Sequence, residues 1–409
     1  MNRPGPPVAI TGLGLLTPAG RGVDCTWERI LTGRSAATVD PDLGDAPWAM
    51  SCRVSGFNAR TELGGGRAWR LDRFAQLAIA AARDAVTDAD LDTSTWDGAR
   101  VAVVLGNSLG GSATFETQQH VHAYEGADMV SPLLVPMWMP NMVAGYVAIE
   151  LGARGPSMVT ATACASGTTA IGTGRDLLRS GACDIAIVGG SESALSPTVM
   201  AGLAKMGALS NRGEDAGSAS RPFEIERDGF VAAEAAGVLV LERESDAVAR
   251  AVRRYASIVG YAATSDAYHA TAPRPDGASL KAAIRGALDD AGIAECDIGH
   301  VNAHGTSTPL NDRTESAALY EVFGERAAVT STKGVTGHPL AAAGAIEAAF
   351  TALAIRDQIV PPTANLNCQD PDVRIDIVSK FARTTPMDAA ISVSAGFGGH
   401  NAALVLTAV

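Results

Sequence analysis

Residues 162–167 read Thr162-Ala163-Cys164-Ala165-Ser166-Gly167 and lie where a strand-like pattern changes into a helical one. The next stretch, Thr168–Ser180, repeats its apolar residues at helical spacing, and Ile185–Gly190 is an almost continuous apolar run. Such a run is typical of a strand that is covered on both faces. A strand, a tight turn of small residues, a helix and a second buried strand in succession indicate an α/β fold.

The same alternation runs along the rest of the chain. Short apolar runs predict further strands at Val8–Leu13, Val101–Gly106, Gly237–Glu242, Ser257–Tyr261, Ile298–Ala303, Ile391–Ala395 and Ala403–Thr407. Amphipathic patterns predict helices between them at Leu71–Thr87, Ser279–Ala291, Asp312–Phe323 and Pro339–Arg356. We therefore expect a layered α/β architecture throughout.

The order of these elements is repeated once, which suggests a duplicated unit. In each half, a strand, a helix and a strand are followed by a glycine-rich turn that opens a helix of small residues, and two adjacent strands close the half. The chain has 409 residues, more than the roughly 250–300 at which a single hydrophobic core stops growing. We therefore predict two units, residues 1–250 and residues 251–409, with the functional site at their junction.

The composition excludes several classes of partner. The formal net charge of −12 argues against nucleic acid, because neutralising phosphates requires clustered Lys and Arg. No stretch approaches the ~18 consecutive apolar residues of a membrane span. The first predicted strand follows the N-terminus too closely to leave room for a signal peptide. We expect a cytoplasmic protein that binds neither nucleic acid nor membrane, with its six scattered cysteines reduced.

Cys164 differs from the other cysteines in its surroundings. A thiol at a helix N-terminus lies near unpaired backbone N–H groups and a partial positive charge, so we expect its pKa to be lowered. Its small neighbours leave room for a substrate carbonyl, and the same N–H groups could stabilise an oxyanion. The alternative is a small residue that merely suits a tight strand–helix junction.

Two histidines lie in glycine-flanked turns further along the chain. His304 follows the predicted strand Ile298–Ala303 and precedes Gly305 and three hydroxyl residues; the alternative is a histidine that caps a loop. His338 precedes Pro339, which predicts a helix start, and the helix dipole should keep this imidazole neutral and able to donate a hydrogen bond. One thiol and two imidazoles on separate turns suit carbon–carbon bond formation on thioester substrates.

Three further residues fit this hypothesis. Lys333 lies one short turn before His338, and Glu347 lies nine residues after it. A buried Lys333–Glu347 pair would hold the turn in shape, whereas the alternative is a solvated surface lysine. Phe397 lies among three glycines, in a loop that can bring backbone N–H groups to an oxyanion and move an aromatic ring as a gate. The alternative for this loop is a purely structural turn.

Other candidates are set aside. His120, His122 and His300 lack supporting neighbours and are predicted to lie at the surface. Gly12-Leu13-Gly14 resembles a dinucleotide-binding fingerprint but lacks the third glycine, and Pro18 follows where a helix should open.

Together these motifs resemble those of the elongating β-ketoacyl-acyl carrier protein synthases of the thiolase superfamily. The resemblance is carried by Val8–Pro18, Ser131–Gly145, Gly155–Gly172, Arg221–Gly237, Asn302–Glu315, Ser331–Glu347 and Gly396–Asn401. It implies a thiolase-like five-layered αβαβα fold built from two duplicated halves. It also implies decarboxylative Claisen condensation of an acyl group on Cys164 with malonyl-acyl carrier protein, with no metal and no organic cofactor.

The resemblance also implies roles for individual residues. Cys164 would be the acylated nucleophile, with His304 and His338 as the histidine pair. Lys333 and Glu347 match the supporting ion pair, and Phe397 matches the gating phenylalanine. The phosphopantetheine arm of the carrier would contact Thr271, Thr306 and Thr308.

Partner contacts follow from the same resemblance. The apolar segment Ser131–Asn141 would lie at a dimer interface, where Met137 helps to shape the acyl tunnel and Leu109 limits its depth; core filling in a monomer is the alternative. The dimer could be a homodimer or a heterodimer with a chain-length-factor-like subunit. The candidates for docking the acidic acyl carrier protein, for which a merely solvated face is the alternative, are Arg67, Arg70, Lys205 and Arg212.

Relatives within the superfamily are distinguished by single positions. A thiolase would carry a second catalytic cysteine in the C-terminal glycine-rich loop. An initiating synthase would have an asparagine in place of the second histidine, and a non-catalytic chain-length factor would lack the cysteine at position 164. His400 and Ala395 depart from the threonine and the aromatic residue usual in the family. These departures suggest the ketosynthase subunit of a type II polyketide synthase, with housekeeping fatty-acid elongation as the alternative and a non-catalytic partner subunit as the less favoured one.

Overall fold

The computed structural model describes residues 6–409, so the first five residues of the predicted unit 1–250 lie outside the described residues. Within this part, one sheet of 11 strands has the order β6-β5-β7-β9-β1-β10-β16-β15-β11-β12, with β2 paired to β1. Its strands are β1 Val8–Thr17, β2 Gly20–Arg21, β5 Val101–Gly106, β6 Ser157–Thr160, β7 Ile185–Glu192, β9 Ala235–Arg243, β10 Ser257–Ser265, β11 Ile298–Asn302, β12 Ala328–Thr330, β15 Ala389–Gly396 and β16 His400–Thr407. Smaller sheets contain β3 Thr38–Val39, β4 Met50–Cys52 and β8 Ala232–Ala233, and β13 Ile359–Val360 with β14 Arg383–Thr384.

The helices lie between these strands in sequence. They are α1 Val23–Thr32, α2 Ala59–Glu62, α3 Gly65–Ala68, α4 Arg73–Asp88, α5 Ser112–Glu125, α6 Leu134–Trp138, α7 Met142–Leu151, α8 Ser166–Arg179, α9 Pro197–Lys205, α10 Ala216–Ala219, α11 Glu244–Ala249, α12 Ala278–Ala291, α13 Pro309–Phe323, α14 Lys333–Thr336 and α15 Ala343–Asp357. None of the helices in residues 6–409 is both long and apolar enough to cross a lipid bilayer.

The order of the large sheet is symmetric about the contact between β1 and β10. Outward from that contact, β9, β7, β5 and β6 on one side correspond to β16, β15, β11 and β12 on the other. On both sides the first two pairings are antiparallel and the next two are parallel. The two halves therefore repeat one topology. The predicted boundary at residue 250 falls between α11 and β10.

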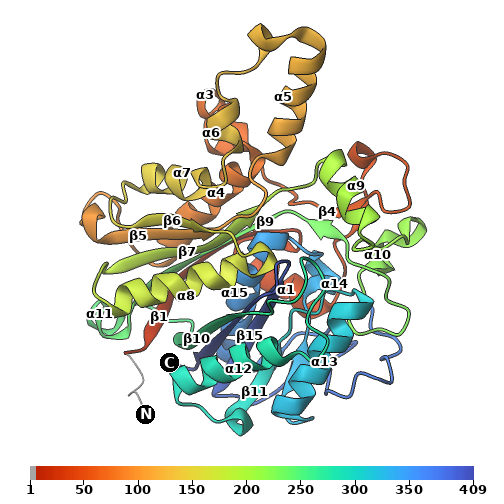
Figure 1. Ribbon diagram of the computed structural model, residues 1–409. Coiled ribbons are helices and arrows are strands. Elements are labelled where there is room, and N and C mark those ends of the chain that lie inside the picture. Colours follow the sequence, from red (N-terminus) through yellow and green to blue (C-terminus); the bar gives the residue numbers. More distant parts are fainter. Residues whose placement is uncertain (1–5) are drawn as a thin grey trace.

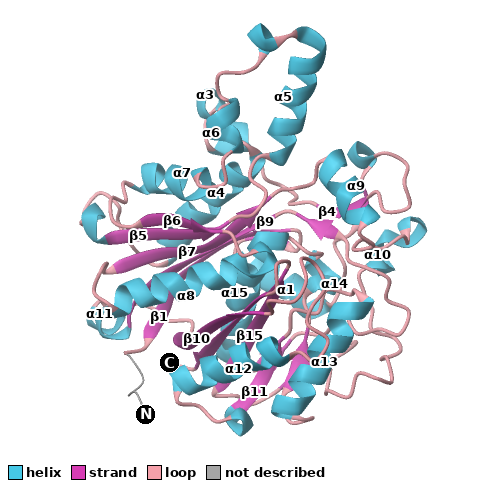
Figure 2. Ribbon diagram, viewed as in Figure 1, coloured by secondary structure: helices cyan, strands magenta, loops and turns pink. Residues whose placement is uncertain are grey.

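Helices and sheet halves alternate in layers (Figures 1 and 2). Helices α8 and α15 pack against each other between the two halves of the sheet, where the central hydrophobic core lies. Helices α4 and α7 cover the outer face of the first half, and α12 and α13 cover the outer face of the second. The described residues thus form the five-layered αβαβα arrangement that the family resemblance implied.

Close packing of a strand on a helix accounts for the Gly12-Leu13-Gly14 motif. A Cβ atom at Gly12 would lie 2.2 Å from the backbone oxygen of Ala85 on α4. Gly260 on β10 stands in the same relation to α12 in the second half, because a Cβ atom there would lie 2.1 Å from the oxygen of Ala287. Glycine at these positions lets strand and helix approach, so the motif has a structural role.

Residues 112–138, hereafter the arm, protrude from the layered body and carry α5 and α6 (Figure 1). The predicted interface segment Ser131–Asn141 overlaps the arm. Strand β6, at the end of the sheet, also exposes Met158. Exposed apolar side chains and open strand edges are both typical of surfaces that contact another protein. The exposed large apolar side chains of the arm are Phe115, Tyr124, Met129, Val135 and Trp138.

Candidate active site

Cys164 lies in the turn between β6 and α8. It is the middle residue of a short 3₁₀ turn, Ala163–Ala165, and α8 begins at Ser166. Ala163 has a φ of 49°, in the left-handed region that a residue with a side chain rarely adopts. Backbone in this conformation is held by its surroundings, and it is concentrated at functional sites.

The pKa of the thiol departs from the prediction. We expected the helix N-terminus to lower it, but Cys164 is only 7% exposed and burial raises its pKa to about 12. The ammonium of Lys333 and the backbone N–H of Phe397 oppose this rise without overcoming it. A sequence pattern indicates where a helix starts but not how deeply the thiol before it is buried. Cys164 therefore rests as a thiol.

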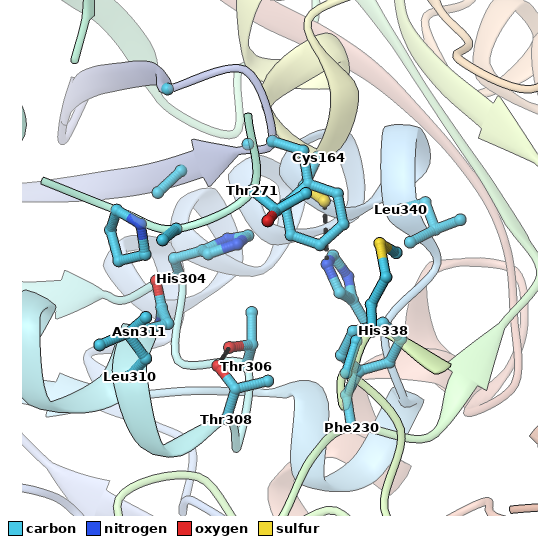
Figure 3. Close-up of a pocket in the computed structure, with 18 of the residues that line it drawn as sticks. Cys164, Phe230, Thr271, His304, Thr306, Thr308, Leu310, Asn311, His338 and Leu340 are labelled. Carbon is cyan, nitrogen blue, oxygen red and sulfur yellow. Dashed lines mark hydrogen bonds between the residues drawn. The ribbon is translucent and has the colours of Figure 1, made fainter. Parts of the chain in front are cut away.

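The imidazole of His338 lies next to this thiol. Its Nε2 atom is 3.2 Å from Cys164 Sγ (Figure 3). The backbone N–H of His338 donates to the backbone oxygen of Val231 at 2.8 Å, which holds the His338 backbone in position. A thiol and an imidazole at this distance can exchange a proton directly.

His338 is neutral, as predicted, but for a different reason. The helix expected from Pro339 begins only at Ala343, after the 3₁₀ turn Leu340–Ala342, so His338 is not at a helix N-terminus. Burial, helped by the charge of Lys333, holds the pKa of His338 well below its ordinary value.

His304 approaches the same point from the second half of the sheet. Its ring lies 5.4 Å from that of His338, centroid to centroid, at an interplanar angle of 82°. Burial, followed by the charges of Lys333 and His338, holds its pKa well below the ordinary value. Cys164, His304 and His338 thus converge from separate turns, as the sequence predicted (Figure 3).

A buried glutamate that the sequence reasoning missed holds the His304 turn. Glu315 on α13 accepts hydrogen bonds from the backbone N–H of His304 at 2.6 Å and from that of Gly305 at 2.7 Å. Burial raises the pKa of Glu315 to about 7. An acidic residue inside the apolar pattern of Asp312–Phe323 was the signal that could have found it.

The predicted Lys333–Glu347 pair is present and fully buried. Lys333 Nζ donates both to Glu347 and to the backbone oxygen of His304. Burial raises the pKa of Glu347 to about 7, although Lys333 opposes the rise. The pair joins α14, α15 and the His304 turn.

A cavity of about 200 Å³ opens from Cys164 to solvent. Thr271, Thr306 and Thr308, the residues predicted to contact the carrier arm, line it, and the hydroxyls of Thr306 and Thr308 lie 2.8 Å apart. Phe397 and Ala395 also line it, whereas Leu109 and Met137 are not among its lining residues. Apolar side chains at the cavity are Phe230, Leu310 and Leu340 (Figure 3).

The four predicted docking residues do not form one patch around the cavity. Lys205 is exposed at the end of α9, next to Met206, which lines the cavity. Arg67 forms an ion pair with Glu150, and Arg70 lies over the Trp69 ring, in a region beside the arm rather than beside α9. Arg212 faces the carboxylates of Glu226 and Asp228.

His300 was predicted to lie at the surface, and this is wrong. The residue is 0% exposed on β11, where its Nδ1 atom lies 2.8 Å from the oxygen of Ala328. Burial lowers its pKa to about 4, so the ring is neutral inside the sheet. His120 and His122 are exposed on α5, as predicted.

Cys164, His304 and His338 form the one group of three among residues 6–409 whose ligand atoms could hold a metal ion, since these atoms lie within 4.8 Å of one another. Thiolate and imidazole suit zinc. Metal-binding histidines usually donate their second ring nitrogen to a carboxylate or carbonyl, but Nδ1 of both rings has no hydrogen-bond partner. The buried ammonium of Lys333 would also repel a dication. The three side chains fit acid–base and nucleophilic chemistry better than a resident metal.

Two family models match the chain. "Beta-ketoacyl synthase, N-terminal domain" covers residues 6–247, and "Beta-ketoacyl synthase, C-terminal domain" covers residues 255–367. The chain belongs to the β-ketoacyl synthase family and is a ketosynthase, an acyltransferase that forms carbon–carbon bonds.

Individual relatives are similar over nearly the whole chain. The 3-oxoacyl-[acyl-carrier-protein] synthase 2 of Staphylococcus aureus (strain COL) is 44% identical over 403 residues, with 97% of both chains covered. The synthase 2 of Synechocystis sp. (strain ATCC 27184 / PCC 6803 / Kazusa) is 42% identical over 404 residues, again with 97% of both chains covered.

Solved structures share the fold. A β-ketoacyl synthase from Burkholderia phymatum STM815 matches with a TM-score of 0.93 and 31% identity, covering 99% of this chain and all of the other. A chain of AntDE:AntF, described as a type II PKS acyl-carrier protein in complex with its ketosynthase bound to the hexaketide, matches with a TM-score of 0.92 and 32% identity over the same shares.

Proposed function

We propose that this ketosynthase condenses an acyl group, carried on Cys164, with malonyl-acyl carrier protein and releases CO₂. The observation that carries the proposal is the 3.2 Å contact between Cys164 Sγ and His338 Nε2, with His304 beside it, at the closed end of a solvent-connected cavity. A neutral base in contact with a buried thiol is the arrangement that nucleophilic acyl transfer requires.

In the first half-reaction the sulfur of Cys164 attacks the acyl thioester of a loaded carrier. The bond between acyl carbon and carrier sulfur breaks, a bond to Cys164 forms, and the thiol proton passes to the leaving thiolate. We propose that the backbone N–H groups of Cys164 and Phe397 hold the oxyanion, which is supported by the Phe397 N–H that acts on the Cys164 sulfur. Glycine at position 396 lets the Phe397 loop approach the Cys164 backbone, because a Cβ atom at this position would lie 3.0 Å from the nitrogen of Cys164.

In the second half-reaction the malonyl thioester occupies the same cavity. The imidazoles of His304 and His338 donate hydrogen bonds to its thioester oxygen as the carboxylate leaves as CO₂. The resulting enolate carbon attacks the acyl carbonyl on Cys164, a carbon–carbon bond forms, and the bond between the acyl carbon and the Cys164 sulfur breaks. The released thiolate takes a proton from solvent, which restores the Cys164 thiol. These steps use only protein groups, carrier thioesters and solvent, so the proposal includes no metal and no organic cofactor.

The three threonines of the cavity are proposed to bind the phosphopantetheine arm. Thr306 and Thr308 present paired hydroxyls on one wall, and Thr271 lies across from them. Hydroxyl donors on two sides suit the amide groups of an extended arm. Docking of the acidic carrier itself at Lys205 is part of the proposal, because this exposed cation is next to the cavity entrance.

For the pathway, we favour elongation of acyl chains by a synthase of the type that the 44% identical relative represents. Type II polyketide elongation, which the sequence suggested, is the second candidate. It is favoured by Ala395 at the cavity wall and by the structural match to the AntDE:AntF ketosynthase. Products made from a saturated acyl carrier and malonyl carrier distinguish the two: one condensation on a saturated chain supports the first, and repeated unreduced extensions support the second.

The arm and β6 are proposed to be covered by a second ketosynthase-type subunit. Their exposed apolar side chains and open strand edge would otherwise invite aggregation. A second copy of this chain is the first choice, and a chain-length-factor subunit, as in the ishigamide ketosynthase/chain length factor structure, is the other. The mass of the purified protein, alone and after co-expression with neighbouring gene products, decides between them.

Intact-protein mass spectrometry tests the chemistry. Incubation with octanoyl-carrier should add one octanoyl mass to the wild type and none to Cys164→Ala, and malonyl-carrier should then remove it as β-ketoacyl product. A wild-type protein that never gains acyl mass would support the non-catalytic partner subunit instead.

A further inference from the structure

The loop after β5 lies against the turn that carries Cys164. The hydroxyl of Ser108 donates to the backbone oxygen of Ala163 at 3.2 Å and lies 3.2 Å from that of Ser166. Ser166 Oγ donates to the same oxygen at 2.6 Å and accepts from the N–H of Thr162 at 2.9 Å. Two serine hydroxyls therefore hold the left-handed residue immediately before the nucleophile.

A buried carboxylate fixes this loop from the opposite side. Glu192, the last residue of β7, is 0% exposed. Its Oε2 atom accepts from the backbone N–H of Ser108 at 2.9 Å and of Leu109 at 3.3 Å, and its Oε1 atom accepts from Asn107 Nδ2 at 3.0 Å. All three partners are hydrogen-bond donors, and an ionised carboxylate, which only accepts hydrogen bonds, is the side-chain group that matches them.

We infer that Glu192 is a positioning residue for the nucleophile, acting through Ser108 on the turn that places Cys164 Sγ beside His338. The inference rests on the proposed role of Cys164 and adds a residue that touches neither substrate nor reacting atom. The path is short and continuous: carboxylate to Ser108 N–H, Ser108 hydroxyl to Ala163 oxygen, and Ala163 to Cys164 along the backbone.

The energetics favour a role in function over one in stability. Burying a carboxylate is costly, and burial raises the pKa of Glu192 to about 7 although its three hydrogen-bond donors oppose the rise. The turn it supports carries a second cost, the left-handed conformation of Ala163. Buried ionisable side chains and strained backbone occur together most often at functional sites, where reacting groups must be held in a fixed position.

Asn107 extends the same support along the loop. Its Oδ1 atom accepts from the N–H of Gly110 at 2.9 Å, while its Nδ2 atom donates to the oxygen of Ser191 at 2.8 Å as well as to Glu192. The loop is therefore closed on itself and anchored to the end of β7. A change at Glu192 would release the Ser108 end, which is the end that faces Cys164.

Single substitutions separate positioning from stability. Glu192→Gln places an amide N–H opposite groups that are themselves hydrogen-bond donors. We therefore expect both kcat and the rate constant of Cys164 alkylation by iodoacetamide to fall by about 10–100-fold. A loss of this size is what a small misplacement of a reacting group produces. KM for malonyl-carrier should stay within about 3-fold, since the cavity walls are unchanged. Ser108→Ala should show a smaller loss of the same kind, whereas Ser108→Thr, which keeps the hydroxyl, should retain the wild-type rate.

The matched control is another buried glutamate far from the site. Glu242 on β9 is 2% exposed and bonds Thr11 and Arg250. Glu242→Gln should lower the melting temperature and leave the alkylation rate constant unchanged. The double variant E192Q/S108A should react no more slowly than E192Q, because both changes break one path.

Folded E192Q and S108A proteins that alkylate and turn over at the wild-type rate would overturn the inference, as would an equal loss in E242Q. If E192Q does not fold, the comparison of alkylation rate constant and kcat between S108A and S108T tests the inference by itself. Failure of the proposed function is distinguishable, because it would appear as acylation or condensation that survives in Cys164→Ala, whatever the Glu192 variants do.

Discussion

Lys333 on α14 and Glu347 on α15 form an ion pair whose side chains are 0% and 1% exposed. Lys333 also donates to the backbone oxygen of His304, so one ammonium joins three elements around the site. After burial, its charge contributes to the lowered pKa of both His304 and His338. The pair therefore holds the His304 turn in place, and its ammonium adds to the burial that keeps both imidazoles neutral.

Removing one partner of this pair should be costly. Lys333→Met leaves the Glu347 carboxylate buried without a counter-charge, and the free energy of unfolding should fall by about 3–5 kcal/mol. Urea unfolding followed by circular dichroism measures the loss. Lys281, paired with the half-exposed Glu321, is the control, and Lys281→Met should change stability by less than about 1 kcal/mol. Equal effects at both lysines would contradict the structural role of the buried pair.

The pH dependence of stability should report Glu315. Burial, with the nearby charge of Asp312, raises its pKa from 4.5 to about 7, although the N–H groups of Gly305 and His304 oppose the rise. An acid with a raised pKa binds more protons in the folded state, so its contribution to stability is greatest below about pH 4.5 and falls as pH rises to 7.

Glu315→Gln removes this titration. The unfolding free energy of the variant relative to wild type should therefore rise between pH 5 and pH 8, by a few kcal/mol at most. Urea unfolding at each pH gives the difference. The half-exposed Glu295 is the control, and Glu295→Gln should change the free energy of unfolding by less than about 1 kcal/mol. A flat difference for Glu315→Gln would show that the buried carboxylate does not titrate there.

Gly396 lets the loop that carries Phe397 lie close to the Cys164 turn. A Cβ atom there would lie 2.6 Å from the oxygen of Thr162 and 3.0 Å from the nitrogen of Cys164. Gly396→Ala should push the loop away from the oxyanion position and reduce kcat by about 10²-fold. Gly202→Ala on α9, where a Cβ atom meets nothing within 4 Å, should leave turnover unchanged. If kcat of Gly396→Ala equals that of the wild type, the loop does not contribute to the oxyanion site.

The paired hydroxyls of the cavity should act on binding of the carrier arm. Replacing Thr306 and Thr308 by valine keeps their shape and removes two hydrogen-bonding groups worth about 1 kcal/mol each. KM for malonyl-carrier should rise about 10–30-fold, while alkylation of Cys164 by iodoacetamide keeps its rate. Thr87→Val, on the exposed face of α4, is the control. A loss confined to kcat would place the threonines in the chemical step instead.

The sequence predicted the fold closely because its signals are local. Val101–Gly106 is a strand with the predicted bounds, and the helix predicted at Ser279–Ala291 spans Ala278–Ala291. The convergence of Cys164, His304 and His338 was inferred from three separate glycine-flanked turns and a family resemblance, and the three side chains do meet. Leu109, Met137 and the docking arginines remain predictions.

What the sequence could not predict depends on depth and on contacts between distant segments. His300 looked like a surface residue, yet β11 lies inside the sheet, so a polar side chain there is buried. The raised pKa of Cys164 has the same cause. Glu192 was missed because the loop it holds follows a neighbouring strand, 84 residues away in the chain. Glu315 was missed because its contact with the His304 turn, 11 residues before it, depends on how α13 packs against that turn.

A single-turnover experiment tests the central claim most directly. Octanoyl-loaded protein is mixed with malonyl-carrier labelled at its free carboxyl carbon, and released CO₂, acyl-Cys164 and β-ketoacyl-carrier are followed together. We expect one CO₂ and one β-ketodecanoyl-carrier for each octanoyl group lost from Cys164, and no CO₂ from a His304→Ala/His338→Ala variant that still carries the octanoyl group. Condensation product without CO₂ release, or unchanged CO₂ release in that variant, would contradict the account.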